Sequence, residues 1–152
     1  MAYTVVCLTN ENKGLLVDFE KIIRETEPEI WTGDFDVREY KDKVSNRDFN
    51  TQNNIVISAI KDNKIIGRCD LIMHESMMDF QKTGYIDWIY VEKTNRGSGI
   101  GKVLIEKAVE QARQLGAEYC YLFTAGNAEA QAFYKGLDIL ELDRKEVAHR
   151  YF

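Results

Sequence analysis

The sequence has little proline and little cysteine. Pro28 is the only proline among 152 residues, so few positions are barred from regular secondary structure. The three cysteines, Cys7, Cys69 and Cys120, are odd in number and lack Cys-x-x-Cys spacing. A disulfide framework and a zinc site are therefore not indicated. We expect three reduced thiols in the core and no metal.

An excess of basic residues and a long apolar run are also missing. Lys and Arg number 20 against 25 Asp and Glu, which gives a net charge of −5. A nucleic-acid or membrane-surface protein would usually be basic. No apolar stretch approaches the roughly 18 residues of a membrane-spanning helix, and residues 1–9 do not resemble a signal peptide. We expect a cytoplasmic protein with no nucleic-acid or membrane partner.

The residues that are present predict one α/β domain over residues 1–152. A hydrophobic content of 45% is enough for a single core. Apolar residues at three- and four-residue intervals predict helices at 13–25, 98–115 and 128–135, with a weaker helix near 35–44. Runs of β-branched and aromatic residues predict strands at 3–8, 54–61, 65–74, 84–91 and 119–123. Two closing strands are expected at 139–142 and 145–152.

A glycine-rich turn follows the strand at 84–91 and opens the longest helix. It contains Gly97, Gly99 and Gly101, and glycines let the backbone approach a ligand closely. The first amides of the following helix have no intrahelical partners and carry the positive end of the helix dipole. The pattern indicates a pyrophosphate site, and an ordinary loop that begins a helix is the alternative.

The spacing of this turn distinguishes among phosphate-binding motifs. Neither the P-loop pattern nor Gly-x-Gly-x-x-Gly is present. Arg96-x-x-Gly99-x-Gly101 after a strand resembles the acyl-CoA signature of the GNAT N-acetyltransferase superfamily. The predicted order, β-α-α-β-β-β-α-β-α-β-β with a mixed sheet, is similar to that fold from end to end.

A second motif strengthens the resemblance. Asn127-x-x-Ala130-x-x-Phe133-Tyr134 is similar to the family element in which an Asn opens a helix and a Tyr closes its second turn. By itself it also fits a capped amphipathic helix with a buried aromatic pair. One departure is that Asp138 stands where the family commonly has glycine.

The resemblance implies acetyl-CoA as co-substrate and assigns its binding residues. In the family, the strand before the turn is splayed from its neighbour and pairs with the pantetheine arm, and the loop amides hold the pyrophosphate. The residues that these roles imply here are Ile89, Tyr90, Val91, Arg96, Gly97, Ser98, Gly99, Ile100, Gly101, Lys102 and Asn127.

The chemistry of acetyl transfer needs an acid and a base. The resemblance implies Tyr134 as the acid at the departing sulfur. Asp87, placed by strand alternation on one face with Tyr85 and Ile89, is the first choice of base. Glu92, Glu75 and a water chain remain alternatives.

The expected activity is transfer of acetyl from acetyl-CoA to a primary amine of a small molecule, by direct attack in a ternary complex. A protein or peptide acceptor and a non-catalytic acyl-CoA-binding regulatory domain are the alternatives. Trp31 and the loop carrying Met77, Met78 and Phe80 either pack on the core or line the acceptor site. The C-terminal run 147–152 either closes the sheet or pairs with a second copy as a homodimer.

Overall fold

A five-stranded sheet in the order β1-β2-β3-β4-β5 forms the centre of the first of two compact units. The computed structural model describes residues 2–152; the units are residues 1–122 and 123–152. The first unit contains β1 (Thr4–Cys7), α1 (Leu15–Thr26), the short 3-10 helix η1 (Pro28–Ile30), α2 (Val37–Asn46), β2 (Asn54–Lys61), β3 (Lys64–Glu75), β4 (Lys82–Val91), the 3-10 helix η2 (Lys93–Asn95), α3 (Ile100–Gln114) and β5 (Tyr119–Leu122).

The sheet is mixed. Strands β1 to β4 pair antiparallel in sequence order, and β4 pairs parallel with β5 through the α3 crossover. The predicted mixed α/β fold is therefore confirmed, and the predicted strand at 54–61 matches β2 residue for residue. The weaker helix prediction is confirmed as α2, whose first amides are capped by the Asp36 side chain.

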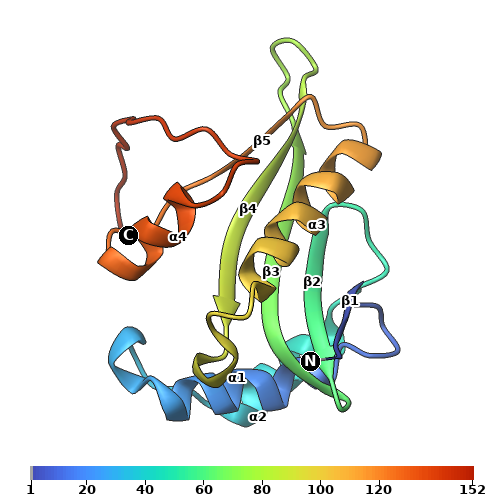
Figure 1. Cartoon of the computed structure of the whole chain (residues 1–152). Helices are drawn as coiled ribbons and strands as arrows, with labels where there is room; N and C mark the ends of the chain where they lie inside the picture. The colour runs from blue at the N-terminus through green and yellow to red at the C-terminus, as the bar shows by residue number, and fades with distance from the viewer. Residues whose placement is uncertain (1) are drawn as a thin grey trace. The chain divides into compact units, whose positions relative to one another are not determined.

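Helix α3 lies across one face of the sheet, in front of β3 in Figure 1. Its apolar stripe is buried: Ile100, Leu104, Ile105, Ala108 and Ala112. Two glycines of the sheet allow this close contact. A Cβ on Gly67 would lie 3.0 Å from the Leu104 side chain and 3.1 Å from that of Ile100, and a Cβ on Gly84 would lie 2.8 Å from Ala112.

Helix α1 covers the opposite face, and its buried side chains form a core with those of the sheet. Phe19 packs edge-on against Tyr90, with ring centroids 6.2 Å apart. Trp31, in the loop after α1, packs on Trp88 at 5.4 Å and donates from Nε1 to the Ile23 carbonyl at 3.3 Å. Of the two alternatives for Trp31, the structure shows packing on the core.

A buried ionic cluster joins α1 to β3 on this face. Arg68 contacts Glu20 at 2.7 Å, makes two hydrogen bonds of 2.7 Å to Asp70 and donates to the Tyr40 hydroxyl at 3.2 Å. Although burial lowers the pKa of Arg68, the neighbouring carboxylates more than offset this effect and raise it. The guanidinium therefore stays charged in the core. Removal of one charged partner would leave another charge buried without compensation.

The second unit contains α4 (Ala128–Lys135), and no other helix or strand is found between residues 123 and 152. The predicted strands at 139–142 and 145–152 are therefore wrong. Their apolar side chains do not form a buried face: Leu142, Val147 and Tyr151 are exposed, and four charged residues separate Leu142 from Val147.

The three cysteines are free thiols. Cys69 is buried, Cys7 and Cys120 are half-buried, and burial raises the pKa of all three. In the part of the chain that the structure describes, no helix has the length and apolar character that a bilayer crossing requires.

The contact between Gly84 and Ala112 gives a first testable prediction. Gly84→Ala should lower the free energy of unfolding by about 1–3 kcal/mol, because the new methyl group collides with α3. Urea unfolding followed by circular dichroism measures the change. Gly14→Ala is the matched control, since a Cβ there meets nothing within 4 Å and its φ is −58°. Equal stability of the two variants would contradict the prediction.

Candidate active site

Strand β4 contains a β-bulge at Asp87. Its pairing with β3 shifts register there: Asp70 faces Trp88, whereas Leu71 faces Ile86. Asp87 is the extra residue, and a bulge of this kind redirects the side chains that follow it. Strict alternation along the strand predicts Tyr85 and Ile89 on one face. The bulge puts them on opposite faces, which corrects that prediction.

The same point on β4 is where it leaves β5. The parallel ladder ends with the pair Ile86 and Leu122, the last residue of β5, whereas β4 continues to Val91. The second half of β4 thus has β3 on one side only within the first unit, since β5 has already ended. This agrees with the splayed strand that the family resemblance implies.

Backbone alternation shows which groups face that open edge. The Glu92 amide donates to the Ile66 carbonyl of β3 at 3.0 Å, so the groups of residues 88 and 90 also point toward β3. The N–H and C=O of Ile89 and Val91 then point the other way. In agreement, the Val91 carbonyl accepts a hydrogen bond of 3.0 Å from the Arg96 side chain.

The loop after β4 turns through two left-handed glycines. Gly97 has φ +75° and Gly99, the N-cap of α3, has φ +82°. Residues with a Cβ rarely adopt these angles. A Cβ on either glycine would meet nothing within 4 Å, so the space beside both is open.

The first turn of α3 has no side-chain cap among the described residues. Intrahelical bonding begins where the Val103 amide donates to the Gly99 carbonyl at 3.2 Å. The amides of Ile100, Gly101 and Lys102 precede it and carry the positive end of the helix dipole. Lys102 is half exposed and adds a positive charge, weakly paired with Glu106 at 3.9 Å.

Short hydrogen bonds fix the loop between β4 and α3. The Ser98 hydroxyl donates to the Asn95 carbonyl at 2.6 Å, and the Asn95 side chain donates to the Glu92 carboxylate at 2.8 Å. Glu92, an alternative base, is therefore engaged in loop structure. Its role in proton transfer stays a prediction.

Arg96 is bound by a carboxylate from the end of α1. Its Nη1 and Nη2 donate to the two oxygens of Glu27 at 3.1 and 2.6 Å, and the guanidinium lies over the Tyr90 ring at 5.1 Å. The Tyr90 hydroxyl also donates to Glu27. Glu27 was missed by the sequence reasoning, and no local pattern marks it, because 69 residues separate it from Arg96.

This network shifts two pKa values in opposite directions. Burial tends to raise the pKa of Glu27, but the hydrogen bonds from Tyr90 and Arg96 together with nearby positive charge outweigh it, so the pKa is lowered. The pKa of Tyr90 is raised, first by burial and then by its bond to the Glu27 carboxylate. Glu27 is thus an anion and Tyr90 a neutral donor near neutral pH.

Asp87 is exposed and lies beside Tyr85. Burial, followed by the charge and hydrogen bond of Asp87, raises the pKa of Tyr85. An exposed carboxylate at the point where β4 opens is well placed to attract a cationic amine. The structure does not test its role as a base.

Asn127 and Tyr134 belong to the second unit. The Asn127 side chain caps α4 by accepting from the Ala130 amide at 2.8 Å, and Tyr134 is buried. Both residues thus occupy the helix positions that the motif implies. Their roles toward a cofactor stay predictions.

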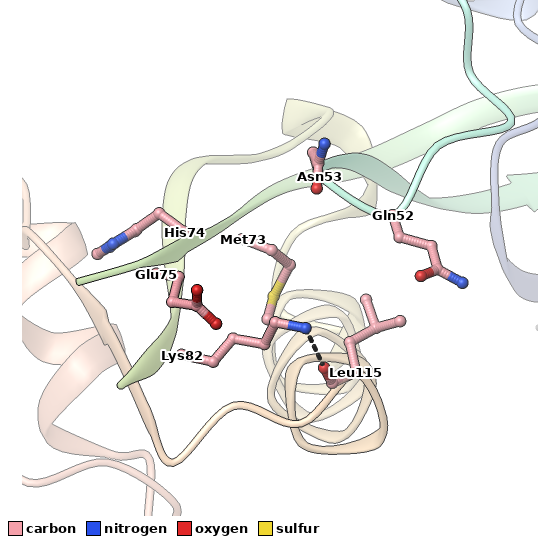
Figure 2. Close-up of a pocket in the computed structure, with 7 residues that line it drawn as sticks. All are labelled: Gln52, Asn53, Met73, His74, Glu75, Lys82 and Leu115. Atoms are coloured by element: carbon pink, nitrogen blue, oxygen red, sulfur yellow. Dashed lines mark hydrogen bonds between the residues drawn. The ribbon is translucent and has the colours of Figure 1, made fainter. Parts of the chain in front are cut away.

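A polar cavity of about 250 Å³ lies elsewhere, near the end of α3 remote from the glycine loop. Figure 2 shows Lys82 donating to the Leu115 carbonyl at 3.1 Å, with Glu75 beside it and His74 turned away. The 15 residues of α3 place this cavity about 22 Å from the loop. Glu75 is therefore remote from the glycine loop.

No cluster of three or more His, Cys, Asp or Glu side chains suited to a metal is found in residues 2–152.

The mixed sheet, with a strand edge that opens beside the start of α3, agrees with the predicted acetyltransferase fold. Residues 16–138 match the model of the acetyltransferase (GNAT) family, and the chain belongs to this family. The predicted family and class of enzyme, an N-acetyltransferase, are confirmed.

Solved structures of other proteins share the fold. An aminoglycoside acetyltransferase from an uncultured soil metagenomic sample, crystallised with sisomicin, has a TM-score of 0.77 at 18% identity, over 99% of this chain and 95% of that one. An integron cassette protein from the mobile metagenome of V. cholerae has 0.82 at 18%, over 100% and 93%. A ribosomal-protein-alanine N-acetyltransferase from Brucella melitensis biovar Abortus 2308 has 0.74 at 16%, over 99% and 100%. At these identities the likeness shows the fold alone.

The lowered pKa of Glu27 gives a prediction for acid stability. Because the folded-state pKa lies below the unfolded value of about 4.3, the carboxylate stabilises the fold above that pH and loses this contribution as pH falls through the folded pKa. Glu27→Gln should cost about 1–3 kcal/mol at pH 7. The difference from wild type in urea unfolding should shrink between pH 5 and pH 3. A constant difference over that range would contradict the assignment.

Proposed function

We propose that the protein transfers the acetyl group of acetyl-CoA to a primary amine of a small-molecule acceptor, by direct attack in a ternary complex. The observation that carries the proposal is the pairing of two features at the end of β4. Its backbone edge opens after Ile86, and the glycine loop beyond Val91 leads directly into the uncapped start of α3.

The residues present fit coenzyme A. Open space beside Gly97 and Gly99 leaves room for a diphosphate near the amides of residues 97–102. The N–H and C=O groups of Ile89 and the N–H of Val91 face an edge that an amide-containing pantetheine arm can pair with, as an added strand would. We retain Arg96, Ser98, Ile100, Gly101, Lys102 and Asn127 as binding residues, with Arg96 acting through its charge and its hold on the loop. Tyr90 was predicted to bind the cofactor as well, but its backbone groups face β3 and its ring is buried, so we assign it a supporting role through Glu27.

Bound acetyl-CoA supplies an activated acetyl thioester and a thiolate leaving group. A backbone N–H of the open edge, at Ile89 or Val91, stabilises the oxyanion that develops at the carbonyl. Asp87 accepts a proton from the acceptor ammonium, and the Tyr134 phenol donates a proton to the departing sulfur. We also propose that residues 1–152 act as a single acetyltransferase domain.

Two features support an amine acceptor of small size. The exposed Asp87 carboxylate and the net charge of −5 favour a cation. One structure with the same fold is an aminoglycoside acetyltransferase crystallised with sisomicin. The peptide alternative is supported by the ribosomal-protein-alanine N-acetyltransferase, which has the fold as well.

The proposed diphosphate site formed by the amides of residues 97–102 is called the cradle below. Substitution of one of its glycines tests cofactor binding. Gly99→Ala should weaken coenzyme A at least tenfold in calorimetry, because the methyl group enters the open space and the left-handed angle is lost. Gly33→Ala is matched for strain, with φ +83° and no atom within 4 Å of the new Cβ, but it lies in another loop. Both should lose about 1 kcal/mol of stability. Equal coenzyme A affinity in the two variants would contradict diphosphate binding at residues 97–102.

Turnover is tested by thiol release from acetyl-CoA with a panel of amines. Aminoglycosides and polyamines represent small acceptors, and peptides with free N-termini represent the alternative. Tyr134→Phe should lower kcat about 10²- to 10⁴-fold and leave the Kd of coenzyme A within about twofold, because it removes only the acid. Binding without thiol release for any acceptor would instead support a regulatory domain.

A further inference from the structure

We infer that Glu27 is a positioning residue of the coenzyme A site, which orders the diphosphate cradle through Arg96 before the ligand arrives. The inference rests on the proposed function. It assigns a role to the end of α1, an element that contains none of the cofactor-binding residues proposed above.

Arg96 closes the loop between β4 and α3 from inside. Its Nε binds the carbonyl of Val91, the last residue of β4, at 3.0 Å, while its backbone leads directly into Gly97. One side chain therefore ties the open strand edge to the first glycine of the cradle. The position of this guanidinium therefore sets how the glycine loop leaves the end of β4.

Glu27 is the group that holds the guanidinium in this position. Both of its oxygens accept from Arg96, one of them at 2.6 Å, in the paired geometry that is the strongest arrangement of an arginine and a carboxylate. The Glu27 side chain is only 9% exposed, so water competes poorly for these bonds. Tyr90 donates to the same carboxylate and prevents it from turning away.

The carboxylate itself is immobilised by the backbone around it. Glu27 is the C-cap of α1, with its amide bound to the Ile23 carbonyl at 3.1 Å, and Pro28 follows. Trp31 of the same loop packs on Tyr90 with ring centroids 6.0 Å apart. The Glu27 carboxylate is thus attached to a firmly packed segment of the backbone. A rigid support of this kind pre-organises the binding loop that it contacts.

Loss of the charge should release the loop and weaken the ligand. Glu27→Gln removes the negative charge of Glu27 from the guanidinium while side-chain size is kept. We expect the Kd of coenzyme A, measured by calorimetry at pH 7.5, to rise about tenfold or more. Hydrogen exchange of the amides of residues 97–102 should accelerate in the ligand-free protein. The KM for acetyl-CoA should rise with it, and the KM for the acceptor should change less than twofold.

Three comparisons separate positioning from a general loss of structure. Glu25→Gln is the matched control on the same helix, because Glu25 is 64% exposed and pairs weakly with Lys21 at 4.0 Å; it should bind coenzyme A as wild type does. S-acetylpantetheine lacks the diphosphate, so its kcat/KM should be unchanged in Glu27→Gln. Arg96→Gln and the double variant should share one Kd, because Glu27 acts through Arg96.

Each outcome of these measurements either supports the positioning role of Glu27 or overturns it. If wild type binds coenzyme A and Glu27→Gln binds it equally well, or if both thioesters lose activity equally, Glu27 has no positioning role. If wild type binds no coenzyme A, the proposed function fails and the inference fails with it. Should Glu27→Gln not fold, Glu27→Asp retains the charge but is too short to reach both nitrogens, and it should show the same selective loss for the diphosphate ligand.

Discussion

The close contact of α3 with the sheet at Gly67 is the constraint on which the site depends. A Cβ at this position would lie 3.1 Å from Ile100, the first residue of α3, and 3.4 Å from Val91, the last residue of β4. The absent side chain thus allows the start of the helix and the end of the strand to meet. A helix held even slightly farther from the sheet would move its amides away from the open strand edge.

Two buried ion pairs fix the position of α1 on the face of the sheet opposite to α3. Arg68 joins α1 to β3 through Glu20, and Arg96 joins the end of α1 to the end of β4 through Glu27. Such pairs add little net stability, since desolvation offsets much of their attraction. They do penalise any arrangement in which one partner is buried alone. Helix α1 is therefore restricted to one position relative to the glycine loop.

Local patterns in the sequence predicted most of the fold. The three- and four-residue spacing of α3 identified its buried stripe, and the β-branched run at 54–61 gave the bounds of β2, because these signals depend on near neighbours. The closing strands at 139–152 were predicted from scattered apolar residues, and such residues do not specify pairing. The bulge at Asp87 has no signature in sequence, since it depends on how β3 and β4 shift register. Glu27 was missed for the same reason: its partner is brought near only by the fold.

The proposed cradle consists mainly of main-chain amides, and this affects how the sequence of such a chain can diverge. Selection on a site of this kind acts on backbone angles, which Gly97 and Gly99 satisfy, rather than on the identity of most neighbouring side chains. Mutational drift can replace those side chains while the hydrogen-bond donors stay in place. The fold itself is shared with structures at only 16–18% identity, so most of its positions tolerate replacement of the side chain.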